Sequence, residues 1–130
     1  MTADPQNHDR LRQPPQERFA VDQLNIDLTA TTKRLRAEPR AGEHGHRQET
    51  LYKSAGSTIA LFAFDRFTNL AEHKAAGIVQ IQVLRGKFKI TAGGNVHELA
   101  AGQMLILGPG VPHAVGAEEE GEILVTVLLS

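Results

Sequence analysis

The feature that most constrains this chain is a series of short apolar runs, separated by glycine turns, from about residue 50 to residue 129. Several runs alternate apolar and polar residues, which is the side-chain period of a β-strand. We expect turns at residues 85–86, 93–94 and 109–110. Short strands at regular spacing predict an all-β protein, an antiparallel sandwich or barrel, and a barrel of this size can hold one small ligand.

The run VQIQV shows the alternation most clearly. Val79, Ile81 and Val83 share one face of the expected strand, and Gln80 and Gln82 share the other. Because the interior of a small barrel is normally its apolar face, we expect the three aliphatic residues to point inward.

The N-terminal part of the chain has a different character. Residues 1–20 are polar and rich in proline, so they bury too little apolar surface to offset their ordering entropy and are predicted to form a flexible arm. Residues 21–49 are expected to hold a short helix and then a loop. Together with the barrel domain at 50–130, they complete the predicted organisation.

The expected helix is amphipathic, but its apolar stripe is narrow. Asn25 or Asp27 can cap it, Leu28 and Leu35 fall on one face, and Pro39 follows its end. A helix with so narrow an apolar stripe needs a larger surface to lie on. We therefore expect the N-terminal segment from about Phe19 to Leu35 to cover this barrel or that of a partner subunit.

The composition excludes several classes of protein. The chain has 130 residues, enough for one domain, and its 14 Lys and Arg balance 15 Asp and Glu, so no basic surface predicts nucleic-acid binding. It has no cysteine, and therefore no disulfide or thiolate site. No apolar run approaches the roughly 18 residues of a membrane span, and no signal peptide is apparent. The expectation is a cytoplasmic protein without membrane or nucleic-acid partners.

The stretch LILGPGVPHAV places a single histidine after a turn. Gly102, the strand QMLIL, Pro109, Gly110 and His113 together resemble the second motif of the cupin superfamily. The resemblance covers about residues 50–129 and implies an RmlC-like jelly roll, an antiparallel β-barrel of the conserved cupin-2 type with a short N-terminal helix.

The first cupin motif is degenerate here. It consists of a His-x-His pair, then a Glu and a Gly, and Gly86 in VLRG provides the anchor. Counting back from Gly86 places His73 at the first histidine position, Ala75 at the second and Val79 at the Glu position.

In most cupins these three histidines and one glutamate hold a divalent metal, so the resemblance leaves His73 and His113 as the candidate ligands. Two imidazoles and water can hold a transition metal such as Zn, Ni, Mn or Fe weakly. The alternative is two neutral histidines lining a pocket. The predicted ligand pocket consists of His73, Val79, Ile81, Val83 and His113.

Other polar groups are weaker candidates. His44, His46 and Glu49 imitate the first motif, but their spacing is too short and they precede the expected strand pair, so a solvated loop is the favoured interpretation. His97 lies beside a hairpin and is expected at the surface or the barrel rim. The acidic turn at residues 118–122 is also expected to be solvated.

The function predicted from these residues is small-molecule binding inside the barrel, with or without a weakly held metal. Two alternatives remain open: a metal-dependent cupin enzyme of the dioxygenase or isomerase type, and a non-catalytic sensor or assembly module. No catalytic residue is assigned. Since cupins commonly pair, the resemblance also implies a homodimer.

Overall fold

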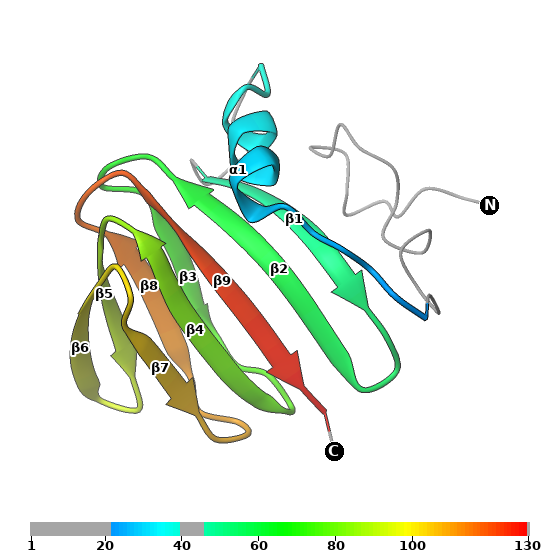
Figure 1. Cartoon of the computed structure of the whole chain (residues 1–130). Coiled ribbons are helices and arrows are strands. Elements are labelled where there is room, and N and C mark those ends of the chain that lie inside the picture. The colour runs from blue at the N-terminus through cyan, green and yellow to red at the C-terminus, as the bar shows by residue number, and fades with distance from the viewer. Residues whose placement is uncertain (1–21, 40–45, 130) are drawn as a thin grey trace.

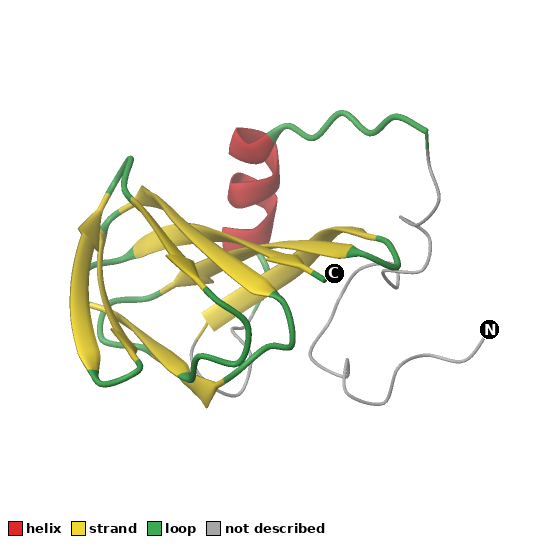
Figure 2. Ribbon diagram, turned by 90° about the horizontal axis from the view of Figure 1, so that it is seen from below, coloured by secondary structure: helices red, strands yellow, loops and turns green. Residues whose placement is uncertain are grey.

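The computed structural model describes residues 22–39 and 46–129, which form two facing antiparallel sheets and one helix. The elements are α1 (Leu28–Arg36), β1 (His46–Lys53), β2 (Ser57–Phe64), β3 (Asn69–His73), β4 (Ile78–Arg85), β5 (Lys87–Ala92), β6 (Asn95–Ala100), β7 (Met104–Leu107), β8 (His113–Ala117) and β9 (Gly121–Leu128). The five-stranded sheet has the order β1-β2-β9-β4-β7, and the four-stranded sheet has the order β3-β8-β5-β6 (Figure 1). The two sheets enclose the barrel interior and α1 lies outside it (Figure 2). The predicted all-β antiparallel barrel with a short helix is confirmed.

The inner faces of the two sheets share one apolar core. Val79, Ile81 and Val83 of β4 are buried in this core, whereas Gln80 and Gln82 are half-buried on the opposite face. Burial of such an alternating face removes apolar surface from water, which is the main force that closes one sheet on the other. Whether the three aliphatic residues also line a ligand pocket stays a prediction.

The barrel is packed more tightly at one end than at the other. At the packed end, Phe64 and Phe88 are fully buried and meet edge to face, with ring centroids 5.4 Å apart and planes at 74°. Toward the end where β3 finishes and β4 begins, the inner side chains of Val125 and Val127 are only half-buried. This second end is called the open end below.

Helix α1 begins after Asp27, whose carboxylate accepts a hydrogen bond of 3.0 Å from the backbone N–H of Ala30. Of the two predicted caps, Asp27 therefore fills the role. Ile26 and Leu28 pack with the helix against the outer face of the five-stranded sheet. The buried members of this second core are Leu35, Leu51, Leu61 and Ala63.

The N-terminal segment is thus seen to cover this chain's own barrel from Ile26 to Leu35. The predicted flexible arm at residues 1–20 lies outside the described residues. Within the described ranges, no helix is long and apolar enough to cross a membrane.

Two arginines of α1 bind carboxylates on the barrel. The Nη2 of Arg34 donates to both carboxylate oxygens of Glu49 on β1, at 3.0 and 2.9 Å. The Nε of Arg36 donates to Glu122 on β9 at 2.5 Å, and its Nη2 donates to the backbone oxygens of Phe64 and Gly121. The helix is therefore held by charged hydrogen bonds as well as by apolar contact.

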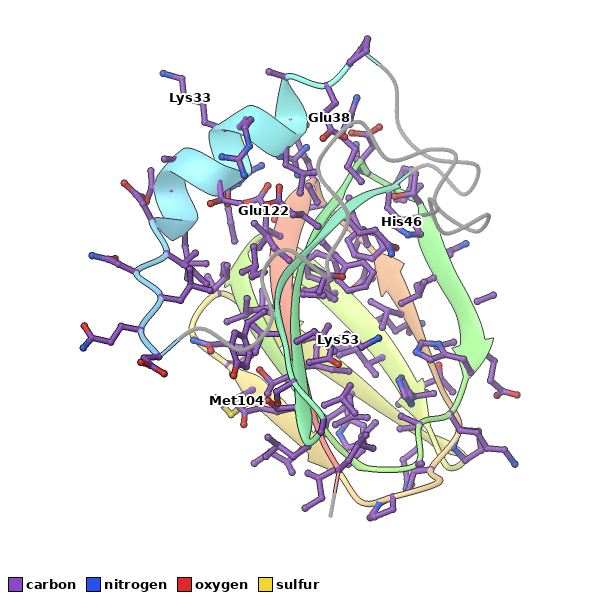
Figure 3. All side chains as sticks on the ribbon, turned by 90° about the vertical axis from the view of Figure 1, so that its right-hand side faces the viewer. Lys33, Glu38, His46, Lys53, Met104 and Glu122 are labelled. Atoms are coloured by element: carbon purple, nitrogen blue, oxygen red, sulfur yellow. The ribbon has the colours of Figure 1, made fainter. Side chains whose placement is uncertain are left out.

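Glu122 lies beneath the helix and is the centre of this network (Figure 3). It also accepts hydrogen bonds of 2.9 and 2.8 Å from Arg85. Burial alone would raise the pKa of the Glu122 carboxyl, but the hydrogen bonds from Arg85 and Arg36 outweigh it and hold the pKa below its ordinary value of 4.5. Hydrogen bonds with Glu122 and Glu120 raise the pKa of Arg85.

Two segments were predicted to be solvated, and both predictions are wrong in part, because each segment contains buried residues. His46 and Glu49 belong to β1 and are both buried, because the His46 ring packs on Phe64 with centroids 5.3 Å apart and Glu49 is paired with Arg34. His44 lies outside the described residues. In the acidic turn, residues 118–120 are exposed as expected, but Glu122 is buried against its two arginines.

Candidate functional site

His73 and His113 lie side by side on adjacent strands of the four-stranded sheet. His73 is the last residue of β3 and His113 the first of β8, and the antiparallel register places them directly opposite each other. Their ring centroids are 4.3 Å apart and their planes are inclined at 60°. His113 is 2% exposed, whereas His73 is exposed at the rim of the barrel.

The backbone orients both rings in the same way. The Nδ1 of His73 lies 3.0 Å from the carbonyl oxygen of Ala71, and the Nδ1 of His113 lies 3.0 Å from that of Val111. A carbonyl oxygen only accepts, so each Nδ1 carries the proton that is donated. In the neutral form, Nε2 of each ring is then the nitrogen with a lone pair for a ligand or a metal.

The separation of the rings is slightly shorter than that expected for two ligands of one metal ion. Two imidazoles that bind a metal through Nε2 at about 2.1 Å, with about 90–109° between the bonds, have centroids about 4.6–5.3 Å apart. The observed 4.3 Å lies just below that range. Within residues 22–39 and 46–129, no group of three or more His, Cys, Asp or Glu side chains is placed to hold a metal. The described residues therefore offer at most these two imidazoles as side-chain ligands at this place.

The two remaining positions of the first cupin motif carry no ligand atoms in their side chains. Ala75 is half-buried against the main core, and its backbone oxygen accepts a hydrogen bond of 2.9 Å from the N–H of Gly110. Val79 is buried opposite Leu107 and Val127. The bond between Ala75 and Gly110 ties the loop after β3 to the loop before β8, and so fixes the rim beside the two histidines.

Lys53 is an inner-face residue that the sequence did not reveal. A bulge at Leu51 shifts the register of β1, so Lys53 pairs with Thr58 and lies on the inner face. Strict alternation from His46 would have placed it on the outer face, and no local sequence signal marks the bulge. In Figure 3, Lys53 lies at the other end of β1 from His46.

The remaining described histidines are remote from the pair. His97 on β6 is half-buried opposite Ile90, and β5 lies between its strand and β8. His46 stacks on Phe64 at the packed end, and its Nε2 lies 3.1 Å from the side-chain oxygen of Gln48. These positions are typical of structural histidines.

An open hollow of about 450 Å³ lies at the packed end of the barrel. It is separated from the histidine pair by the length of β8, since Glu118 follows the last residue of that strand and His113 is its first. Charges of both signs line the hollow and favour no ligand class. Its lining residues are Arg66, Lys87, Glu98, Leu99, Ala100, Gln103, Glu118 and Glu119.

The fold agrees with the comparisons with known proteins. Residues 72–129 match the cupin domain family. No curated protein matches the chain. The barrel therefore has the fold of the RmlC-like cupins.

Solved structures resemble the chain in fold at low sequence identity. A conserved protein of unknown function from Streptococcus pyogenes is 23% identical, with 87% of this chain and 92% of that chain covered and a TM-score of 0.67. A cupin superfamily protein from Desulfitobacterium hafniense is 18% identical, with 87% and 96% covered and a TM-score of 0.68. Salicylate 1,2-dioxygenase from Pseudoaminobacter salicylatoxidans is 16% identical, with a TM-score of 0.68, and the match covers 78% of this chain but 32% of that one.

Proposed function

We propose that the chain binds a small molecule at the open end of the barrel, with His73 and His113 as its polar anchor. The observation that carries the proposal is the pair itself, two imidazoles 4.3 Å apart at the edge of an apolar interior. Ligand sites are typically apolar, with a small number of fixed polar groups that orient the ligand. Here the hydrogen bonds at Nδ1 supply that fixed orientation.

The same pair is proposed to hold a divalent transition metal, Zn, Ni, Mn or Fe, through the two Nε2 atoms. Catalytic zinc sites usually have three protein ligands and structural ones four, so a two-histidine site binds weakly and its occupancy depends on conditions. A metal bound there would supply Lewis-acid chemistry. The chain's own contribution is to hold both rings in the required tautomer.

Binding is favoured over catalysis by what surrounds the rings. Both Nδ1 atoms donate to backbone carbonyls rather than to carboxylates. A carboxylate partner raises the basicity of a catalytic histidine, and a backbone carbonyl does so less effectively. The sensor or assembly alternative involves the same ligand site. The metal-dependent dioxygenase or isomerase alternative would need ligands beyond the pair, and the described residues contain no group of three or more His, Cys, Asp or Glu placed to hold a metal.

Metal analysis and calorimetry test this function. We expect protein purified without an affinity tag to bind Zn²⁺ or Ni²⁺, and His73→Ala and His113→Ala each to weaken that binding at least about tenfold. His97→Ala is the matched control, because it removes a histidine from the same sheet and is expected to leave affinity unchanged. Equal metal affinity in all three variants would contradict the assignment of the pair.

We also propose that the chain forms a homodimer through the outer face of β4, β7 and β9. Ile106 of β7 is 62% exposed, and Ile78, Met104 and Leu128 are exposed on the same face. Met104 points away from the barrel (Figure 3). The edge strand β7 contains no charge and no proline, the usual devices that block pairing of an edge strand. A second copy buries the same patch on both subunits.

Light scattering tests the dimer. We expect the full chain to run as a dimer and Ile106→Glu to run as a monomer, since a charge would be buried without a partner. Val96→Glu is the control, because Val96 is also exposed but lies on β6 of the other sheet. A full chain that is monomeric at high concentration would exclude the dimer.

A further inference from the structure

The histidine pair also restricts the chemistry of a ligand that binds without a metal, an inference that rests on the proposed function. In the neutral rings, both Nδ1 protons are already donated to the backbone oxygens of Ala71 and Val111. The hydrogen-bonding groups of the rings that are still available to a ligand are the two Nε2 lone pairs. The pair therefore offers two hydrogen-bond acceptors and no ring N–H donor.

The inner faces of the two sheets, to which the pair belongs, are mainly apolar and carry little charge. Half-buried side chains that pack on the main core include Leu70, Val111 and Val127. Among the strand residues whose register the structure describes, Lys53 is the one charged residue on the inner face, and it is exposed. A carboxylate or phosphate at the pair would give up water for two acceptors, which is unfavourable without a compensating donor.

We propose that the metal-free site takes an uncharged molecule with an apolar body and an O–H or N–H group, which donates to Nε2 of His73 or His113. Phenols, alcohols and azoles belong to this class. The donor group occupies an acceptor that would otherwise lose its water when the ligand covers it, and the apolar body covers the half-buried aliphatic side chains. Selectivity for such a ligand arises because the site is left with unpaired acceptors when the donor is missing.

The test uses the full chain, freed of metal with a chelator and then dialysed. Phenol, its methyl ether anisole and benzoate are titrated while the His73 and His113 ring signals are followed by nuclear magnetic resonance. Phenol and anisole share an aromatic ring, but anisole has no donor. We expect phenol to bind about tenfold more tightly than anisole, and benzoate to bind more weakly than phenol.

Matched variants assign the preference to the pair. His73→Phe and His113→Phe keep an aromatic ring but remove the acceptor, and each is expected to reduce the preference for phenol over anisole. His73 is exposed, so its variant does not depend on repacking of the core. His97→Phe and Lys53→Met are expected to leave the preference unchanged.

Two results would overturn the inference. One is equal affinity for phenol and anisole. The other is a preference for benzoate that disappears in Lys53→Met, which would make the site an anion site built on that lysine. A zinc titration of the same samples reports on the proposed function separately. If zinc shifts both ring signals while phenol and anisole bind alike, the donor inference alone fails; if neither zinc nor any probe shifts them, the site itself is refuted.

Discussion

Replacing Glu122 with glutamine measures how far charge, rather than apolar contact, holds α1 on the barrel. The Glu122 side chain is 4% exposed and accepts hydrogen bonds of 2.5 Å from Arg36 and of 2.9 and 2.8 Å from Arg85. Hydrogen bonds with charged groups contribute about 1.5–3 kcal/mol each, and removing one partner of a buried ion pair costs about 3–5 kcal/mol. Arg85 is 51% exposed, so water replaces part of what it loses. We expect Glu122→Gln to lower the free energy of unfolding by about 2–3 kcal/mol.

The effect depends on pH, and the pKa of Glu122 sets its sign. Because this pKa is lower in the folded protein than its ordinary value of 4.5, the carboxylate stabilises the fold above that value, and the stabilisation is lost as the pH falls through the folded pKa. The difference in stability between wild type and Glu122→Gln is therefore largest near neutral pH and shrinks below pH 4.5. A difference that stays constant down to about pH 3 would refute an origin in charge.

Urea unfolding followed by circular dichroism, repeated across this pH range, provides the measurement. Glu120→Gln is the matched control: Glu120 lies in the same turn and pairs with Arg85 at 3.0 Å, but it is 55% exposed. Exposed pairs contribute little, so we expect a change within about 0.5 kcal/mol. If the two glutamine variants unfold at the same urea concentration, the buried carboxylate of Glu122 contributes no more to stability than the exposed one of Glu120, which would contradict the prediction.

Three further predictions concern the barrel. Val79→Glu places a carboxylate at the glutamate position of the first cupin motif, and calorimetry should show tighter binding of Ni²⁺, Zn²⁺ or Mn²⁺. Gln80→Glu, on the opposite face of the strand, should show no gain in metal affinity. Gly121→Ala would press a Cβ into the backbone oxygen of Arg85, so we expect the free energy of unfolding measured in urea to fall by more than about 3 kcal/mol. In Gly108→Ala the new Cβ meets nothing within 4 Å, and stability should change little. Leu35→Ala empties a fully buried position under α1 and should lower stability by about 2–4 kcal/mol, and an unchanged melting temperature would show that the helix does not stabilise the barrel.

The barrel strands could be predicted because their sequence reports directly on their two environments. Val79, Ile81 and Val83 alternate with glutamines, and the structure buries the former and leaves the latter half-buried. The turns were recognisable for a related reason: Gly86 and Gly94 have positive φ angles of 90° and 83°, which glycine adopts without the steric cost of a side chain.

The buried polar residues could not be predicted because their partners are distant in the sequence. Glu49 looks like part of a hydrophilic loop until Arg34 of the helix covers it. Glu122 stands in an acidic run, and its partner Arg36 is 86 residues away. A charged residue is normally solvated, and only tertiary structure shows that an opposite charge takes the place of water.

The candidate site was predictable in part. The motif anchors at Gly86 and Pro109 identified His73 and His113, and the structure places their rings side by side. The hydrogen bonds that fix both tautomers come from carbonyls two residues earlier in the chain, and they depend on the backbone conformation of two loops. Whether a ligand or a metal occupies the pair stays a prediction.

The second half of strand β2 is covered on both faces and paired along both edges. Leu61 and Ala63 are fully buried on the face under α1, Phe64 is fully buried on the barrel face, and β1 and β9 pair along the two edges. Its amide hydrogens can exchange with solvent only in an opening that disrupts both cores, so exchange should be slowest at residues 61–64. The rim around His73 is not buried on both faces, so its amide hydrogens should exchange faster. We therefore expect local opening of this rim and global unfolding of the chain to be separate events on separate timescales.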